Sequence, residues 1–515
     1  MRTQNALKNL YITIFQKVVD LILLFIQRTV FIRVLGVTYL GVSGLFSNIF
    51  TIFSLMELGI GSSIIYLLYK PLADGDKEEI SKLMQIYKKF YNAVGIGILI
   101  IGIVLIPGLK YIVNMNNGID NLYLIYLLTL FSTSVSYFFS YKRSLLEADQ
   151  KLYISNLNIF VFNSLATVLR IIVLILFENY LLFLTVTIVM SFISNLVISR
   201  KVSKMYPDIK FNQKIKLKEI NLKPIFSRMF AVSLNSIGNV VLTGTDNIIM
   251  SMYVGLTMVG LYSNYYMFTN MIYTTVSWLF ISVTAGVGNL FATKEKENAF
   301  IVFKRMNFIN YYFYFICCIM LFAFVNPLIS IWIGNSYLFG KITVFIIVLN
   351  LFMTGMRHTN VTFINASGLY YNIKYKPIIE AIINLVLSLI LAKFMGVNGI
   401  LLGTFISLFC VSMWLEPYIL YKEWFKKDWK EYFVKFFGRM GLMLVLMFII
   451  EYIISICNIT NILLLILLAF TVFIILNIVF IIIYHKKEEF KYYFDLISNI
   501  LKKILEKVKS YVIKK

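Results

Sequence analysis

The chain has 515 residues, of which 60% are hydrophobic and only 14% are charged. Soluble domains carry about 25% charged residues and at most about 50% apolar ones, so this composition excludes an ordinary water-soluble fold. A formal net charge of +23 would suit a nucleic-acid-binding protein, but the placement of the positive residues along the chain indicates membrane topology instead.

Fourteen apolar segments follow one another, each near the roughly 20 residues that cross a bilayer as a helix. The predicted fold class is therefore all-α, a polytopic membrane protein. The first segment holds Lys17, Asp20 and Arg28 and lacks a small-residue cleavage site, so we expect it to persist in the mature protein. We expect spans near 10–34, 42–68, 88–112, 120–142, 154–177, 179–199, 229–254, 257–291, 307–333, 341–367, 376–395, 399–421, 432–457 and 460–484.

Lysine and arginine residues collect in alternate connections between these spans. Of the 48 in the chain, 39 lie in the eight segments that would then face the cytoplasm. The predicted outer segments and ends hold only Arg33, Lys110, Lys341 and Lys393. Because positive charge retains short loops in the cytoplasm, we expect a multi-pass protein of the inner (cytoplasmic) membrane with both termini cytoplasmic.

The two halves of the chain resemble each other. Gly36-Val-Thr38-Tyr-Leu-Gly41 has a counterpart 219 residues later in Gly255-Leu-Thr257-Met-Val-Gly260, and Glu147-Ala148-Asp-Gln150 matches Asn365-Ala366-Ser-Gly368 at an offset of 218. Such a repeat predicts two pseudo-symmetric six-helix lobes with a cleft that opens alternately to either side. The predicted parts are an N-lobe (1–199), a cytoplasmic basic linker (200–228), a C-lobe (229–422), two additional helices (423–485) and a cytoplasmic basic amphipathic tail (486–515).

Charged side chains inside the predicted spans are the candidate site. A charge at the bilayer centre costs roughly 2.5 to 3.5 kcal/mol on insertion scales, so such residues should face protein or water. Four cations, Lys17, Arg28, Arg170 and Arg357, predict a cationic cavity that binds an anionic substrate. Asp20, Glu57 and Asp246 are candidates for coupling to a cation.

Polar residues accompany several of these charges. Asn, then Thr four residues later, then a charge three residues later make one stripe on three helices, because seven residues are nearly two helical turns. We predict that Gln27, Asn163, Thr167, Asn239, Thr243, Asn350 and Thr354 line the cavity. The alternative, favoured for the Asn and Thr residues, is that the stripes hold the helices together through hydrogen bonds.

Four short motifs carry a family resemblance. They are Arg33-Val-Leu-Gly36-Val-Thr-Tyr-Leu-Gly41, Glu57-Leu-Gly59-Ile-Gly61, Leu146-Glu-Ala148-Asp-Gln150-Lys-Leu-Tyr153 and Gly396-Val-Asn-Gly399-Ile-Leu-Leu-Gly403. The chain resembles bacterial polysaccharide transporters, the Wzx-like flippases of O-antigen, capsule or teichuronic-type polymers, in the multidrug/oligosaccharidyl-lipid/polysaccharide (MOP) exporter superfamily.

The resemblance implies a flippase that moves undecaprenyl diphosphate-linked oligosaccharide repeat units from the cytoplasmic to the outer leaflet by alternating access. It implies no cofactor, coupling to a Na⁺ or H⁺ gradient, and a monomer that works beside a polysaccharide polymerase and other assembly proteins.

Two other functions stay open. A peptidoglycan lipid-precursor flippase of the same superfamily would share the cationic cavity. A membrane polysaccharide polymerase or ligase would act on similar lipids, but it needs acid and base groups gathered at the outer face, where every predicted loop is short. The sequence also shows no Gly-rich phosphate loop, zinc spacing or nucleophile elbow, so we expect neither an enzyme nor a metal site.

Overall fold

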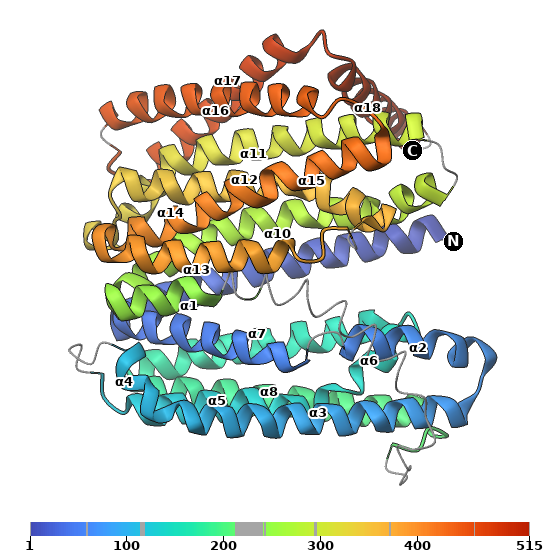
Figure 1. The fold of residues 1–515 in the computed structure, drawn as a ribbon, viewed down its shortest axis with the longest axis vertical. Helices are drawn as coiled ribbons and strands as arrows, with labels where there is room; N and C mark the ends of the chain where they lie inside the picture. The colour runs from blue at the N-terminus through green and yellow to red at the C-terminus, as the bar shows by residue number, and fades with distance from the viewer. Residues whose placement is uncertain are drawn as a thin grey trace. The chain divides into compact units, whose positions relative to one another are not determined.

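The computed structural model describes residues 2–57, 60–113, 119–211, 240, 244–292, 296–369, 372–457 and 459–513. Throughout these residues the chain forms α-helices joined by short turns, and none of them lies in a β-strand (Figure 1). The predicted all-α, polytopic fold class is thus confirmed. The chain divides into two compact units, described separately below.

Unit 1 comprises Met1–Asn264 and Lys374–Gly403. Its long helices pack in neighbouring pairs, with α7 against α1 and α8, and α5 against α3 and α8. The buried aromatic rings of Phe46, Tyr87 and Tyr126 lie at the centre of this packing. The helices are α1 (Arg2–Phe53), α2 (Ile60–Asp74), α3 (Lys77–Leu105), α4 (Leu109–Ile112), α5 (Leu122–Ser140), α6 (Arg143–Ala148), α7 (Leu152–Phe177), α8 (Tyr180–Met205) and α13 (Lys376–Met395), with the first turns of α10 (Leu256–Ala292) and α14 (Val397–Ser407).

Unit 2 comprises Tyr265–Ile373 and Thr404–Lys515. Its central helix is α11, which packs against α12, α16 and α17. The rings of Tyr311, Tyr314, Phe315 and Phe352 are fully buried around it. Besides most of α10, the helices of this unit are α11 (Lys296–Trp332), α12 (Lys341–Ser367), α15 (Met413–Ile419), α16 (Lys430–Ile456), α17 (Ile462–Tyr484) and α18 (Glu488–Ile513).

Ten helices of the described residues are long and apolar enough to cross a membrane. They coincide with the third to sixth and the ninth to fourteenth predicted spans. The first two predicted spans fall on α1 and the segment after it, and the eighth falls on α10. The seventh, 229–254, lies largely outside the described residues.

The segment that follows the first span differs from its prediction. Gly36, with φ +81°, interrupts the helical backbone of α1, as the predicted turn requires. The second predicted span, 42–68, is not one helix: α1 ends at Phe53, a 3₁₀ turn covers Ser54–Glu57, and α2 begins at Ile60. Gly61 has a low helix propensity, and hydropathy alone does not register such a break.

The internal repeat is visible in the backbone. Helix α11 starts 219 residues after α3, and α12 starts 219 residues after α5. Residues with positive φ recur at the same spacing, because Gln150 pairs with Gly368 and Glu178 pairs with Gly396. The predicted correspondence between Glu147–Gln150 and Asn365–Gly368 therefore extends to conformation.

The two glycine turns of the repeat meet within unit 1. A Cβ atom on Gly41 would lie 2.0 Å from the carbonyl oxygen of Leu256, and a Cβ on Gly260 would lie 2.1 Å from that of Val37. Leu256 and Val37 are themselves equivalent positions of the repeat. The contact is reciprocal, and only glycine fits at either position without moving the backbone.

Candidate functional site

Arg28 lies on α1 and is partly buried. Its Nη2 donates to the backbone oxygen of Ser263 at 2.7 Å and to the Ser263 hydroxyl at 3.0 Å. Its Nε is buried and has no hydrogen-bond partner among the described residues. Every group that receives a hydrogen bond from this guanidinium is therefore neutral.

Arg170 is the last member of a polar stripe on α7. Its Nη2 donates to the Thr167 hydroxyl at 2.9 Å, and that hydroxyl donates to the backbone oxygen of Asn163 at 2.8 Å. The predicted stacking of these three residues is thus present. The guanidinium also lies 5.3 Å from the ring centroid of Phe183, a favourable cation–π arrangement.

Aromatic rings connect the surroundings of these two arginines. The Phe183 ring packs against Phe31 with centroids 5.3 Å apart, and Phe31 lies one helical turn after Arg28. Tyr180 contacts both phenylalanines. Because α1 packs along α7, the sequence-predicted pair Arg28 and Arg170 flanks one aromatic cluster in unit 1.

The remaining predicted residues of unit 1 are more dispersed. On α1, Lys17 is exposed, while Asp20 and Gln27 are partly buried. Asp246 is 8% exposed and lies in the helical residues 244–253. Two predicted residues, Asn239 and Thr243, lie outside the described residues.

Glu57 ends the 3₁₀ turn after α1 and faces tyrosines of α3 and α5. Tyr91 donates a short hydrogen bond to its carboxylate, and Tyr137 also contacts it. Tyr87 donates to the Tyr91 hydroxyl at 2.8 Å and accepts from Ser144 at 3.0 Å. The predicted coupling residue is therefore held at the end of a chain of hydroxyl groups that the sequence did not reveal.

Arg357, on α12 of unit 2, forms a buried ion pair with Glu416 of α15. The guanidinium Nη2 lies 2.8 Å and the Nε 3.1 Å from one carboxylate oxygen. The side chains are 17% and 1% exposed, respectively. Unlike Arg28 and Arg170, Arg357 thus has its charge balanced by a neighbouring acid; Asn350 and Thr354, on the same helix, are partly buried.

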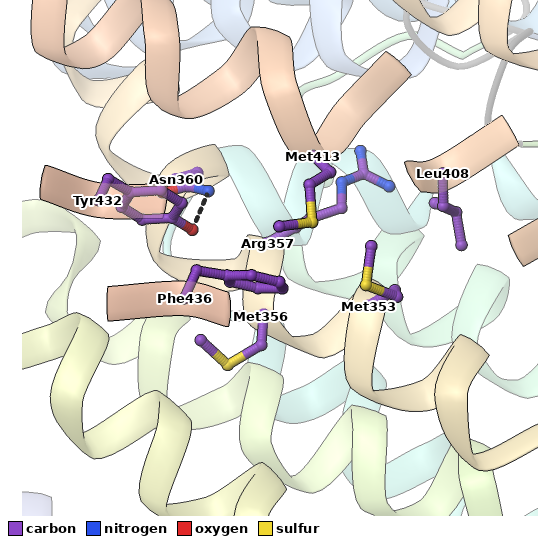
Figure 2. A pocket seen from close by; sticks show the side chains of 8 residues that line it. All are labelled: Met353, Met356, Arg357, Asn360, Leu408, Met413, Tyr432 and Phe436. Carbon is purple, nitrogen blue, oxygen red and sulfur yellow. Dashed lines mark hydrogen bonds between the residues drawn. The ribbon is translucent and has the colours of Figure 1, made fainter. Parts of the chain in front are cut away.

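A small cavity adjoins this ion pair (Figure 2). Asn360 and Tyr432, joined by a hydrogen bond of 3.1 Å, lie on one side of it. It has room for about one water molecule, so it does not accommodate a diphosphate or a sugar in this conformation. Its other lining residues are Met353, Met356, Arg357, Leu408, Met413 and Phe436.

Glu416 is the functional candidate that the sequence analysis missed. It lies within the predicted span 399–421 and could have been counted with the other intramembrane charges. Two π-helical segments, Leu408–Ser412 and Leu420–Phe425, flank the short helix that carries it. Such π-turns occur frequently at functional sites in proteins, and their irregular backbone leaves no trace in hydropathy.

The sequence as a whole was compared with known proteins. A model of the family described as polysaccharide biosynthesis protein matches residues 6–285, more than half of the chain. The chain belongs to the polysaccharide biosynthesis protein family. The family predicted from the four sequence motifs is thereby confirmed. No curated protein sequence matches this family member significantly.

Solved structures identify the fold of this polysaccharide biosynthesis protein. The lipid II flippase MurJ in an inward closed conformation matches with a TM-score of 0.64 and 17% identity, over 91% of this chain and 99% of MurJ. An inward-facing multidrug resistance transporter of the MATE family matches at 0.61 and 14%, over 76% of this chain and 93% of that one. A MOP superfamily transporter from Pyrococcus furiosus matches at 0.52 and 14%, covering 77% and 90%. The protein has the MOP transporter fold.

Proposed function

We propose that this protein is a flippase that translocates undecaprenyl diphosphate-linked oligosaccharide repeat units from the cytoplasmic to the outer leaflet, for the assembly of a surface polysaccharide. Membership of the polysaccharide biosynthesis family supports the substrate class, and the MOP fold supports transport. The single observation that carries the proposal is that Arg28 and Arg170 lie in apolar helices of that fold without a carboxylate partner among the described residues.

The charge of the substrate explains why such arginines would be retained. An intramembrane cation without a counter-ion is costly, and an anionic ligand would supply the missing charge. At an effective dielectric constant near 20, one cation about 4 Å from one phosphate charge gains about 4 kcal/mol before desolvation. Arg28 and Arg170 are therefore the first candidates for the diphosphate, ahead of Arg357, which Glu416 neutralises, and of the exposed Lys17.

The proposed transport cycle is alternating access in the cytoplasmic membrane, with both termini cytoplasmic. A gradient of Na⁺ or H⁺ would drive it, with Asp20, Glu57 and Asp246 as the candidate coupling residues. Gln27, Asn163, Thr167, Asn350 and Thr354, together with Asn239 and Thr243, would contact the sugar or orient the charged residues.

The test is complementation of a strain that lacks its own flippase of this class and accumulates lipid-linked repeat units in the inner leaflet. The intact chain should restore delivery to the outer leaflet, and Arg28→Ala should abolish it at equal membrane abundance. Arg33→Ala is the matched control, because Arg33 is exposed on the same helix five residues away and should be dispensable. Full delivery by Arg28→Ala, Arg170→Ala and their double variant would contradict the proposal.

A second candidate is a peptidoglycan lipid-precursor flippase, favoured by the similarity to MurJ over 91% of the chain. Depletion of a host's own lipid II flippase separates the two functions. If this chain sustains growth there and fails with lipid-linked repeat units, the second candidate replaces the first.

A further inference from the structure

Helix α18 begins directly beside a membrane span. Helix α17 is the most apolar candidate span of the described chain, and it ends at Tyr484. Only residues 485–487 separate it from Glu488, the first residue of α18. Three residues reach at most about 10 Å, so α18 starts at the membrane surface on which α17 ends.

One face of α18 is apolar along its whole length. At 100° per residue, Phe490, Phe494, Ile497, Leu501, Ile504 and Val508 fall within an arc of about 80°. The side chains of Phe494 and Ile497 are 62% and 54% exposed, so unit 2 does not cover that part of the face.

The charges of α18 are sorted around this face. Lys491, Lys502 and Lys509 lie along one edge of the polar side, and Lys503 and Lys507 lie along the other. Three of the acids, Glu488, Asp495 and Glu506, point almost directly away from the apolar face, whereas Glu489 lies near one edge. Lysines at the edges can extend to phosphate groups while the apolar face is immersed, and acids opposite are kept in water.

The polar side of α18 is attached to the protein. The guanidinium of Arg305, on α11, lies 3.7 Å from the ring centroid of Tyr492. Figure 1 shows α18 beside one end of α11. Because Tyr492 lies roughly opposite the apolar face, this contact leaves Phe494 and Ile497 directed away from α11.

From these observations we infer that α18 is an interfacial helix that binds anionic phospholipids of the leaflet where α17 ends, with its edge lysines on the lipid phosphates. The inference does not depend on what the protein transports. In the proposed topology this is the cytoplasmic leaflet, whose surface potential is negative.

Spin labels in the full-length protein test the placement of the helix. Cys317, Cys318, Cys410 and Cys457 are replaced by alanine, and a single cysteine is introduced as Ile497→Cys or as the matched control Asn499→Cys on the exposed opposite face. In vesicles of phosphatidylcholine with phosphatidylglycerol, the label at position 497 should be accessible to oxygen and shielded from a polar nickel reagent. The label at 499 should show the reverse. Equal nickel access at both positions, or shielding of position 497 from both reagents by a protein partner, would overturn the inference.

Lipid composition and lysine substitution test the headgroup. The shielding at 497 should weaken in vesicles of phosphatidylcholine alone. The double variant Lys491→Gln/Lys502→Gln should reduce the preference for anionic vesicles by about fivefold per lysine. Asp495→Asn, which removes an acid from the polar side of the same helix, should leave that preference unchanged or increase it. Shielding that is insensitive to both lipid charge and lysine number would refute anionic lipid binding.

Discussion

Gly41 and Gly260 occupy equivalent positions of the internal repeat, and each lies against the backbone of the other's turn. Both sites require glycine, because an added Cβ would lie about 2 Å from a carbonyl oxygen: 2.0 Å at Gly41 and 2.1 Å at Gly260. In the proposed topology the two turns face the outer side of the membrane. Their reciprocal contact would then hold that side closed in this conformation.

Substitution of either glycine should therefore separate the two turns. We expect Gly41→Ala and Gly260→Ala each to cost about 1 to 3 kcal/mol of this closed arrangement, as overpacking does, and to impair transport without loss of membrane insertion. Gly44→Ala is the matched control one turn along α1, because its Cβ would meet a Val259 side chain at an ordinary 3.6 Å. Cross-linking between cysteines at Val37 and Leu256 measures the separation. Unchanged cross-linking in both alanine variants would rule out the closed contact.

The sequence predicted this contact only in part. Matching glycines and their spacing predicted equivalent turns, since glycine is restricted by backbone geometry that pattern alone can indicate. That the two turns lie against each other depends on long-range packing of α1 with the start of α10. Similarly, hydropathy predicted the span 42–68 correctly in extent, but it did not reveal the 3₁₀ turn at Ser54–Glu57.

The ion pair between Arg357 and Glu416 should be strongly coupled. Arg357→Met leaves a carboxylate that is 1% exposed without its cation, which should cost about 3 to 5 kcal/mol. The double variant Arg357→Met/Glu416→Leu removes both charges and should recover most of that loss. Thermal unfolding in detergent checks the comparison. Additive losses in the double variant would show that the two side chains do not stabilise each other.

Glu57 should matter for coupling rather than for folding. Glu57→Gln keeps an oxygen that accepts from Tyr91 but removes the negative charge, so the protein should fold and lose its response to an imposed ion gradient. Tyr91→Phe is the control that removes the hydrogen bond and keeps the charge; it should cost about 1 kcal/mol in stability and retain gradient-driven transport. Proteoliposomes with imposed pH or Na⁺ gradients separate these outcomes. Gradient-driven transport by Glu57→Gln at the wild-type rate would exclude Glu57 as the coupling group.

The candidate site was predictable to different depths in the two units. Arg170 and its stripe followed from helical periodicity alone, because Asn163 and Thr167 lie on the same helix. The partner of Arg28, Ser263, lies 235 residues away in the sequence, and no local pattern reports such a contact. The same holds for the tyrosines around Glu57.

A cluster outside the spans provides a pH-dependent prediction. Asp149, between α6 and α7, accepts from the Tyr206 hydroxyl at 2.5 Å and pairs with Lys151 at 2.7 Å. Partial burial alone would raise the pKa of Asp149, but the hydrogen bonds from Lys151 and Tyr206 and the charge of Lys151 outweigh it and lower the pKa below its ordinary value. The cluster ties the turn before α7 to the end of α8.

Because the folded pKa of Asp149 is depressed, its contribution is present above the unfolded value near 4 and is lost as pH falls through the folded value. Asp149→Asn should thus lower stability by about 1 kcal/mol at pH 7, and the difference from wild type should vanish in acid. Asp120→Asn, at an exposed carboxylate, is the matched control and should change nothing. Melting curves of the three proteins between neutral and acidic pH test this. A wild-type advantage that persists below the folded pKa would mean that the charge of Asp149 does not stabilise the turn.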